Sequence, residues 1–351
     1  MKPACTPRTS SRVGLREIAE RAGVSLMTVS LSLRNSPKIS PAKRQRIAAL
    51  ADAMGYRPDP QISLLMRHLR RTRAHAIQSF VGLVHLGLEE LPQEGDRATA
   101  FRAAVVKRAD ALGFGVAEFH AGVAGASLPA ILKVVRARGI SGLILTARGA
   151  VSLDPALDWS RLSVVAATDE VVWPRFHQVS PNHSANALHL LDALRARGYR
   201  KVGLVGPREG GVPAAHHFLH PLAWHSEPPV RLVVPAQFSE SAYARLLKPW
   251  LKKHRPDVIV TDLPGPVSQL LAHTLHHRVP QDIGVVGIGL ASADGIAHQE
   301  QRPDLIGENA MDLVGDMILE NERGIPTHRR TILIDGGLRA GESLRPLAAV
   351  A

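Results

Sequence analysis

Side chains suited to contacting DNA lie close together near the N-terminus, in the segment LREIAERAGVSLMTVSLSL, residues 15–33. Its pattern predicts two short helices joined by a turn at Gly23, which is the spacing of a helix-turn-helix. In the second helix Val29 and Leu33 face inward. The side chains left available to DNA are Ser25, Leu26, Met27, Thr28, Ser30, Leu31 and Arg34. Hydroxyl groups near the start of such a helix can reach phosphates, and its first residues enter the major groove.

Positive charge is concentrated in the same part of the chain. The 351 residues carry a net charge of +12, and residues 1–76 hold 15 Lys and Arg against four Asp and Glu. The other residues hold 28 against 27 and are nearly neutral. A basic tail or a patch for anionic membranes is the alternative, but the segment has helical patterning and lacks an aromatic membrane-binding face. A small basic domain on a neutral body therefore predicts double-stranded DNA as the partner.

Several classes of protein lack their residue signatures here. Cys5 is the only cysteine, which excludes an intramolecular disulfide framework and a cysteine-rich zinc site. The N-terminus has no apolar leader and no apolar run is long enough to span a bilayer, so we expect a cytoplasmic protein without membrane contact. No GxSxG, HExxH or Cys/His pair is present, and GPREGG at 206–211 lacks the Lys-Ser/Thr of a phosphate-binding loop. We expect neither an enzyme nor a cofactor.

Three histidines near the middle of the second half have metal-ligand spacing. His273, His276 and His277 fall on one expected helix. Exposed histidines on a solvated helix are the commoner explanation of such a pattern, so no metal site is expected.

The first 76 residues divide into three parts. Residues 1–12 are expected to be a disordered tail, and residues 13–58 a domain of three helices. Gly14 and Ser25 cap the first two helices, and a third runs from Pro41 to about Met54 before Gly55. Residues 59–76 then form a short helix, opened by Asp59 and Pro60, and a basic linker.

From residue 77 to the end, short apolar strands alternate with helical stretches. The expected strands are FVGLVHL, FGVAEFH, GLILTA, VVAAT, KVGLVG, VRLVVP, DVIVTD, DIGVVGIG and TILIDG. Such alternation predicts parallel sheets with helices on both faces. The number of units favours two lobes, with a break near residues 174–181 where WPRFH interrupts the pattern. The fold class is thus a small all-α helix-turn-helix domain followed by a two-lobed α/β core of parallel sheets.

These features together resemble the LacI/GalR family of bacterial regulators. The resemblance starts at VGLREIAERAGVSLMTVSLSLRNSPKIS and continues through RQRIAALADAMGYRPD. Along the core, VSPNHSANALHLLDALRARGYRKVGLVG, PDVIVTDLP, VPQDIGVVGIG and LIGENAMDLV are similar to family segments. The resemblance implies a periplasmic-binding-protein-like core at 77–351. Its N-subdomain would span about 77–178 and 300–325, and its C-subdomain about 179–299 and 326–345.

The resemblance also implies a function. It predicts a homodimeric, sequence-specific DNA-binding transcription regulator, a repressor, controlled by a small-molecule effector bound between the lobes. The helix at 60–66 would be the family's hinge helix, with Leu65 wedged into the minor groove at the operator centre. The alternatives are a solute-binding protein or a sugar-metabolising enzyme on a similar core, without operator binding.

The expected effector site departs from the family pattern. Pro181 and Gly289 stand where many members have acidic residues that bind sugar hydroxyls, so a sugar held in the usual manner is not expected. The recognition helix has Leu31 where an Arg is usual, which leaves base readout to apolar contacts and Arg34. The residues expected to contact the effector are Phe101, His183, His217, Trp224 and Asp262.

Overall fold

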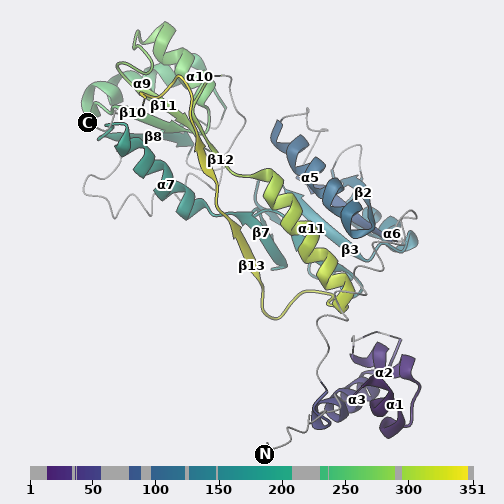
Figure 1. Ribbon diagram of the computed structural model, residues 1–351. Helices are drawn as coiled ribbons and strands as arrows, with labels where there is room; N and C mark the ends of the chain where they lie inside the picture. The colour runs from purple at the N-terminus through teal and green to yellow at the C-terminus, as the bar shows by residue number, and fades with distance from the viewer. Residues whose placement is uncertain are drawn as a thin grey trace, which may run out of the picture.

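A computed structural model describes ten stretches of the chain: 14–33, 36, 38–56, 79–87, 96–122, 126–147, 149–207, 230–235, 237–288 and 295–346. Within these stretches no helix has the length and apolarity needed to cross a bilayer. The elements form a small helical domain and two sheets (Figure 1).

The N-terminal domain consists of three helices around a small apolar core. They are α1 (Leu15–Ala22), α2 (Leu26–Leu33) and α3 (Pro41–Ala53). As predicted, Gly14 is the N-cap of α1 and Pro41 opens α3. The buried residues that join the helices are Ile18, Ala19, Ala22, Val29, Ile47 and Ala51. Because all three helices supply this core, none of them would keep its orientation alone.

The first lobe is a six-stranded parallel sheet in the order β13-β7-β5-β3-β1-β2. Its strands are β1 (Ser79–Leu86), β2 (Phe114–His120), β3 (Gly142–Ala147), β5 (Ser163–Ala166), β7 (His177–Pro181) and β13 (Thr331–Ile334). Helices α5 (Asp96–Leu112) and α11 (Pro303–Glu320) cover one face, and α6 (Leu128–Ala137) covers the other. A separate small pair joins β4 (Val151–Ser152) to β6 (Val171–Trp173).

The second lobe has a six-stranded sheet in the order β14-β12-β11-β10-β8-β9. Its strands are β8 (Val202–Pro207), β9 (Val230–Val234), β10 (Val258–Thr261), β11 (Gly284–Gly287), β12 (His298–Glu300) and β14 (Gly337–Arg339). Helix α7 (His183–Ala196) packs on one face; α9 (Glu240–His254), α10 (Pro264–Gln269) and the π-helix η2 (Leu270–Thr274) pack on the other. Only β14 is antiparallel to its neighbour among the described strands.

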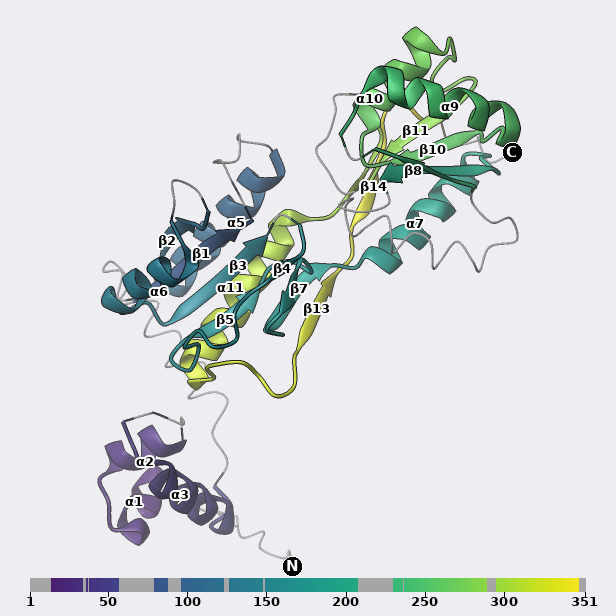
Figure 2. The same ribbon diagram turned by 180° about the vertical axis from the view of Figure 1, so that it is seen from behind.

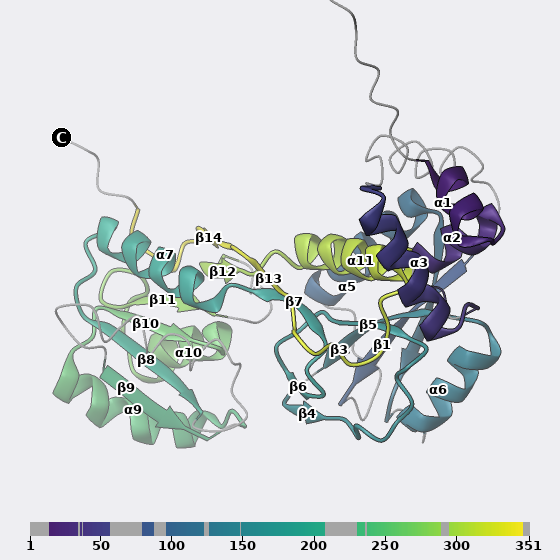
Figure 3. The same cartoon turned by 90° about the horizontal axis from the view of Figure 1, so that it is seen from below.

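The chain passes between the two sheets three times. It crosses from β7 to α7, returns from β12 to α11, and crosses again from β13 to β14. Figure 2 and Figure 3 show these three segments side by side at the junction of the lobes. Two hydrogen bonds tie the first crossing to the third: the Asn182 N–H donates to Ile334 O at 2.8 Å, and the Gly336 N–H donates to the Asn186 side-chain oxygen at 2.7 Å.

The structure moves two of the expected subdomain boundaries. Residues 177–181 form the fully buried strand β7 of the first sheet, so the first crossing follows this segment instead of lying within it. Residues 331–334 pair with β7, and therefore also belong to the first lobe and not to the second. The segment HQVSP is too polar to be predicted as a buried strand. It is buried nevertheless, because partners such as Glu322 and Arg329 form hydrogen bonds with its polar side chains.

Candidate DNA-binding surface and effector site

The turn between α1 and α2 is fixed by Gly23. Its φ of 66° lies in the left-handed region, which glycine adopts without strain. The amide of Val24 donates to Ala19 O at 3.0 Å and closes the end of α1. The chain then reverses and begins α2 two residues later. The angle between the two helices therefore depends on this glycine, as the sequence predicted.

Ser25 caps the second helix through its hydroxyl. The Thr28 amide donates to Ser25 Oγ at 3.1 Å, and the two hydroxyl oxygens lie 2.8 Å apart. This arrangement satisfies one of the free amides at the start of α2. The predicted cap is thus confirmed, and the hydroxyls of Ser25 and Thr28 are held together at the first turn.

The start of α2 presents apolar side chains to solvent. Leu26 is 49% exposed and Met27 69% exposed, whereas Val29 is fully buried in the domain core. Thr28, Ser30 and Leu31 are half-buried. Leu26 and Met27 therefore form an exposed apolar pair at the start of α2.

Four of the predicted contact residues lie outside the described residues. They are Arg34 and Leu65 for DNA, and His217 and Trp224 for the effector. Gly289, one of the two departures from the family pattern, also lies outside them.

His183 lies at the first crossing between the lobes. It opens α7, whose N-cap Asn182 accepts the Ala185 amide and donates to Asp335 at 2.8 Å. The His183 side chain is buried, and its Nε2 lies 3.3 Å from Asp169 Oδ2. The residue is therefore placed at the first crossing, with a carboxylate from the first lobe beside it.

Asp262 follows strand β10 at the carboxyl edge of the second sheet. Burial raises the pKa of Asp262, although hydrogen bonds from its own backbone and Thr261 act in the opposite direction. Its Oδ1 is buried without a hydrogen-bond partner among the described residues. Burial, together with the charge of Asp262, raises the pKa of Tyr243 to about 12. Asp262 thus offers a free acceptor oxygen at the strand end.

Phe101 occupies a different environment from the one expected of an effector contact. It is 9% exposed and packs in the core between α5 and α11. The two helices approach closely here, since a Cβ on Gly307 would lie 2.7 Å from Phe101 O. Phe101 therefore packs in the core that α5 and α11 share, and its contact with an effector stays a prediction.

The three histidines at 273–277 do not share a helix. The π-helix η2 ends at Thr274, and His276 has a φ of 57°, which reverses the chain. His276 and His277 instead line a surface hollow together with residues 278–279, 281, 295–296 and 342–343. The helical spacing assumed from the sequence is therefore wrong, and this hollow contains none of the residues predicted to bind the effector.

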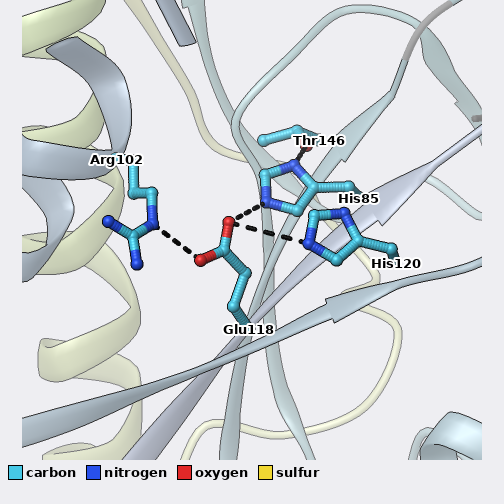
Figure 4. Close-up of polar contacts among 5 residues, drawn as sticks. All are labelled: His85, Arg102, Glu118, His120 and Thr146. Carbon is cyan, nitrogen blue, oxygen red and sulfur yellow. Dashed lines mark hydrogen bonds and ion pairs between the residues drawn. The ribbon is translucent and has the colours of Figure 1, made fainter. Parts of the chain in front are cut away.

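A cluster of five polar residues at the carboxyl edge of the first sheet escaped the sequence analysis (Figure 4). His85 Nε2 lies 2.9 Å from Glu118 Oε1, and Arg102 Nε donates to Glu118 Oε2 at 2.7 Å. Thr146 and His120 complete the group. Burial lowers the pKa of His85, although the hydrogen bond with Glu118 acts in the opposite direction. Burial raises the pKa of Glu118, but hydrogen bonds from Arg102 and His85 outweigh it, so the net pKa is lowered.

A sequence signal for this cluster did exist. His85, Glu118 and Thr146 each stand two residues beyond an apolar residue of the same sheet face, near the ends of three strands. The strands were predicted, but their order in the sheet was not, and only that order brings the residues together.

Comparison with known sequences identifies the N-terminal domain. Residues 14–59 match the family described as "Bacterial regulatory proteins, lacI family". The HTH-type transcriptional regulator GntR of Escherichia coli (strain K12) is 27% identical over 195 residues, which are 55% of this chain and 55% of that protein. The maltose regulon regulatory protein MalI of Vibrio furnissii is 42% identical over 48 residues, 14% of this chain and 35% of that protein. The chain thus aligns with about half the length, or less, of these curated relatives.

Comparison with solved structures covers the core as well. A complex of the transcriptional regulator CelR with cellobiose matches 95% of this chain and 100% of its own, with a TM-score of 0.56 and 19% identity. The Lac repressor dimer bound to operator and the anti-inducer ONPF matches 95% and 99%, with a TM-score of 0.56 and 17% identity. At this level of identity the likeness concerns the fold. The chain therefore has a helix-turn-helix domain that matches the lacI family at residues 14–59, ahead of a two-lobed α/β core with the fold of these regulators.

Proposed function

We propose that the protein is a homodimeric, sequence-specific DNA-binding repressor that a small-molecule effector controls from between the two lobes. The observation that carries this proposal is the tip of α2, where Leu26 and Met27 are exposed on a lacI-family helix-turn-helix domain. Its relatives are transcriptional regulators, and no catalytic motif was found in the sequence. Its place would be the cytoplasm, where a bacterial operator lies.

The chemistry of α2 favours a particular way of reading DNA. An α-helix fits the major groove, where the methyl group of thymine is the apolar feature of the base edges. Leu26 and Met27 offer apolar contacts and no hydrogen bond, so we expect the preferred site to place thymines opposite them. The hydroxyls of Thr28 and Ser30 would contact phosphates, and Arg34 a base edge. The net +11 of residues 1–76 would supply affinity that falls steeply with salt.

Control by an effector would act through the three crossings. A ligand held by residues of both lobes changes the free-energy difference between their relative orientations. His183, at the first crossing, and Asp262, with its unpartnered Oδ1, are the described residues that support such a site. A dimer would present two recognition helices, so the operator should be close to a palindrome. The hinge helix at 60–66, with Leu65, would order on DNA.

Selection of binding sites from random DNA with the full-length protein tests the proposal. Leu26→Ala and Met27→Ala should each relax the preference at one base position per half-site by about 1–3 kcal/mol. Leu188→Ala is the matched control, since this leucine on α7 is 40% exposed and lies in the second lobe. The proposal fails if the native protein enriches no sequence, or if both α2 variants select the same site as Leu188→Ala.

A further inference from the structure

The five polar residues at the carboxyl edge of the first sheet, His85, Arg102, Glu118, His120 and Thr146, are called here the His85 cluster. The parallel register places His85 opposite His120 on β2 and opposite Thr146 on β3. Glu118 lies two residues before His120, and so points to the same face of the sheet. Arg102 reaches the group from α5, the helix that covers this face. Four side chains are therefore fixed by strands and one by a helix.

The His85 cluster lies at the end of the rows of apolar side chains on the sheet face that α5 and α11 cover. Val81 and Leu83 on β1 belong to the core of that face, as does Ile144 on β3, and Val116 on β2 packs against it. One pleat further along each strand the side chain becomes His85, Thr146 or Glu118. The same edge thus changes from aliphatic to imidazole, hydroxyl and carboxylate on three adjacent strands. Packing alone does not require this change.

The ligand atoms of the cluster converge on one point (Figure 4). His85 Nε2 lies 2.9 Å and His120 Nε2 4.0 Å from the same oxygen, Glu118 Oε1. One atom from each of these three residues lies within 4.8 Å of the others. The imidazole rings of His85 and His120 are stacked, with centroids 4.7 Å apart. Two nitrogens and one oxygen of different residues therefore face a shared space.

One member of the cluster has unused hydrogen-bonding capacity. His120 Nδ1 is buried without a partner among the described residues, and the 4.0 Å from its Nε2 to Glu118 exceeds a hydrogen bond. The His120 side chain is nevertheless only 24% exposed. His120 Nε2 is thus only loosely paired with Glu118 Oε1, and a metal ion between the two atoms would bond to both of them.

We propose that the His85 cluster binds one divalent transition-metal ion of the zinc type. The ligands are His85 Nε2, His120 Nε2 and Glu118 Oε1. Imidazole nitrogen with a single carboxylate oxygen suits zinc, cobalt or nickel, whereas magnesium and calcium take oxygen ligands. Adjacent ligands of a tetrahedral zinc ion are about 3.3 Å apart, between the two separations from Glu118 Oε1 given above. A small turn of the His120 ring closes the site.

The remaining two residues, Thr146 and Arg102, contact the proposed ligands and orient them. Thr146 Oγ1 lies 2.8 Å from His85 Nδ1, so it can accept a proton from that nitrogen, which would leave Nε2 free for a metal. Arg102 occupies Glu118 Oε2, which leaves Oε1 as a single ligand atom. Metal-binding histidines and carboxylates regularly have such outer partners. Three protein ligands leave at least one coordination position for water or an oxygen atom of another ligand.

Cobalt titration of the full-length, chelator-treated protein tests this site. Co²⁺ in a tetrahedral nitrogen and oxygen environment absorbs visible light, and the protein itself does not. We expect saturation at one equivalent and displacement by Zn²⁺ but not by Mg²⁺. Glu118→Gln and His120→Ala should each weaken Co²⁺ binding at least about tenfold, and Thr146→Val about tenfold through the outer partner.

Two controls separate this site from adventitious binding. His189→Ala removes an exposed histidine on α7, and the double variant His276→Ala/His277→Ala removes the adjacent pair that lines the surface hollow. Both should titrate like the native protein. Circular dichroism without metal verifies that each cluster variant is folded, and Glu118→Gln keeps the size of the side chain. The proposal is overturned if no saturable absorption develops, if folded cluster variants titrate normally, or if the His276/His277 variant alone abolishes the signal.

Discussion

At the scale of single residues, the carboxylate of Asp262 is buried at the edge of the second sheet, and its Oδ1 has no hydrogen-bond partner among the described residues. Burial raises its pKa above the ordinary value of 3.8. The folded state then binds this proton more tightly than the unfolded chain does. Its contribution to stability is complete below pH 3.8 and is lost as the pH rises through the folded pKa. Asp262→Asn, which carries no charge, should therefore be more stable than the native protein at pH 7.

The pH dependence distinguishes this effect from a change in packing. The difference in free energy of unfolding between Asp262→Asn and the native protein should shrink as the pH is lowered towards 4, measured by urea denaturation at several pH values. Asp192→Asn, on the exposed side of α7, should show no comparable trend. A stability difference that is the same at every pH would contradict the assignment to the buried charge.

At the scale of elements, α2 is a helix of eight residues that depends on its cap. Ser25→Ala removes the oxygen that accepts the Thr28 amide, and should cost about 1 kcal/mol of helix stability. Hydrogen exchange of the α2 amides measures it. Ser40→Ala is the control in the same domain, because Ser40 is the N-cap of α3 but makes no side-chain cap bond. Equal loss of protection in both variants would show that Ser25 does not act as a cap.

Element prediction succeeded where a segment carried its own pattern. The helix-turn-helix could be predicted because Gly23, Ser25 and Val29 act locally. The nine apolar runs are strands in the structure for the same reason. Strand β7 could not be predicted, because partners more than a hundred residues away satisfy His177 and Gln178. Strands β12 and β14, each of three residues, are too short to show a period.

The effector site was less accessible to prediction than the DNA-binding surface. The positions of Asp262 and His183 in the fold could be predicted, because Asp262 follows a recognisable strand and His183 begins a recognisable helix. The core packing of Phe101 could not be predicted, because a helical residue can face the core or the sheet edge and only the packing of α11 decides. The His85 cluster was missed because three separate strands supply it.

At the scale of the whole molecule, the second and third crossings touch at Gly336. A Cβ at this position would lie 1.9 Å from Glu300 O, which is backbone and cannot turn aside. Gly336→Ala should destabilise the core by at least about 1–3 kcal/mol and change the separation of the lobes. Gly337→Ala is the matched control, since nothing lies within 4 Å of its Cβ position. Thermal unfolding and small-angle X-ray scattering measure the two effects; equal behaviour of the variants would exclude the contact.

The chain passes between the two lobes three times, and this also determines which lobe is completed first during synthesis on a ribosome. Residues 79–181 are synthesised first, but α11, which covers one face of their sheet, ends only at Glu320. Until it emerges, Ile144, Val165 and Val179 lack the helix that buries them. The second lobe has five of its six strands by residue 300. The lobe translated later can thus close earlier, and the nascent first lobe keeps apolar side chains exposed for longer during synthesis.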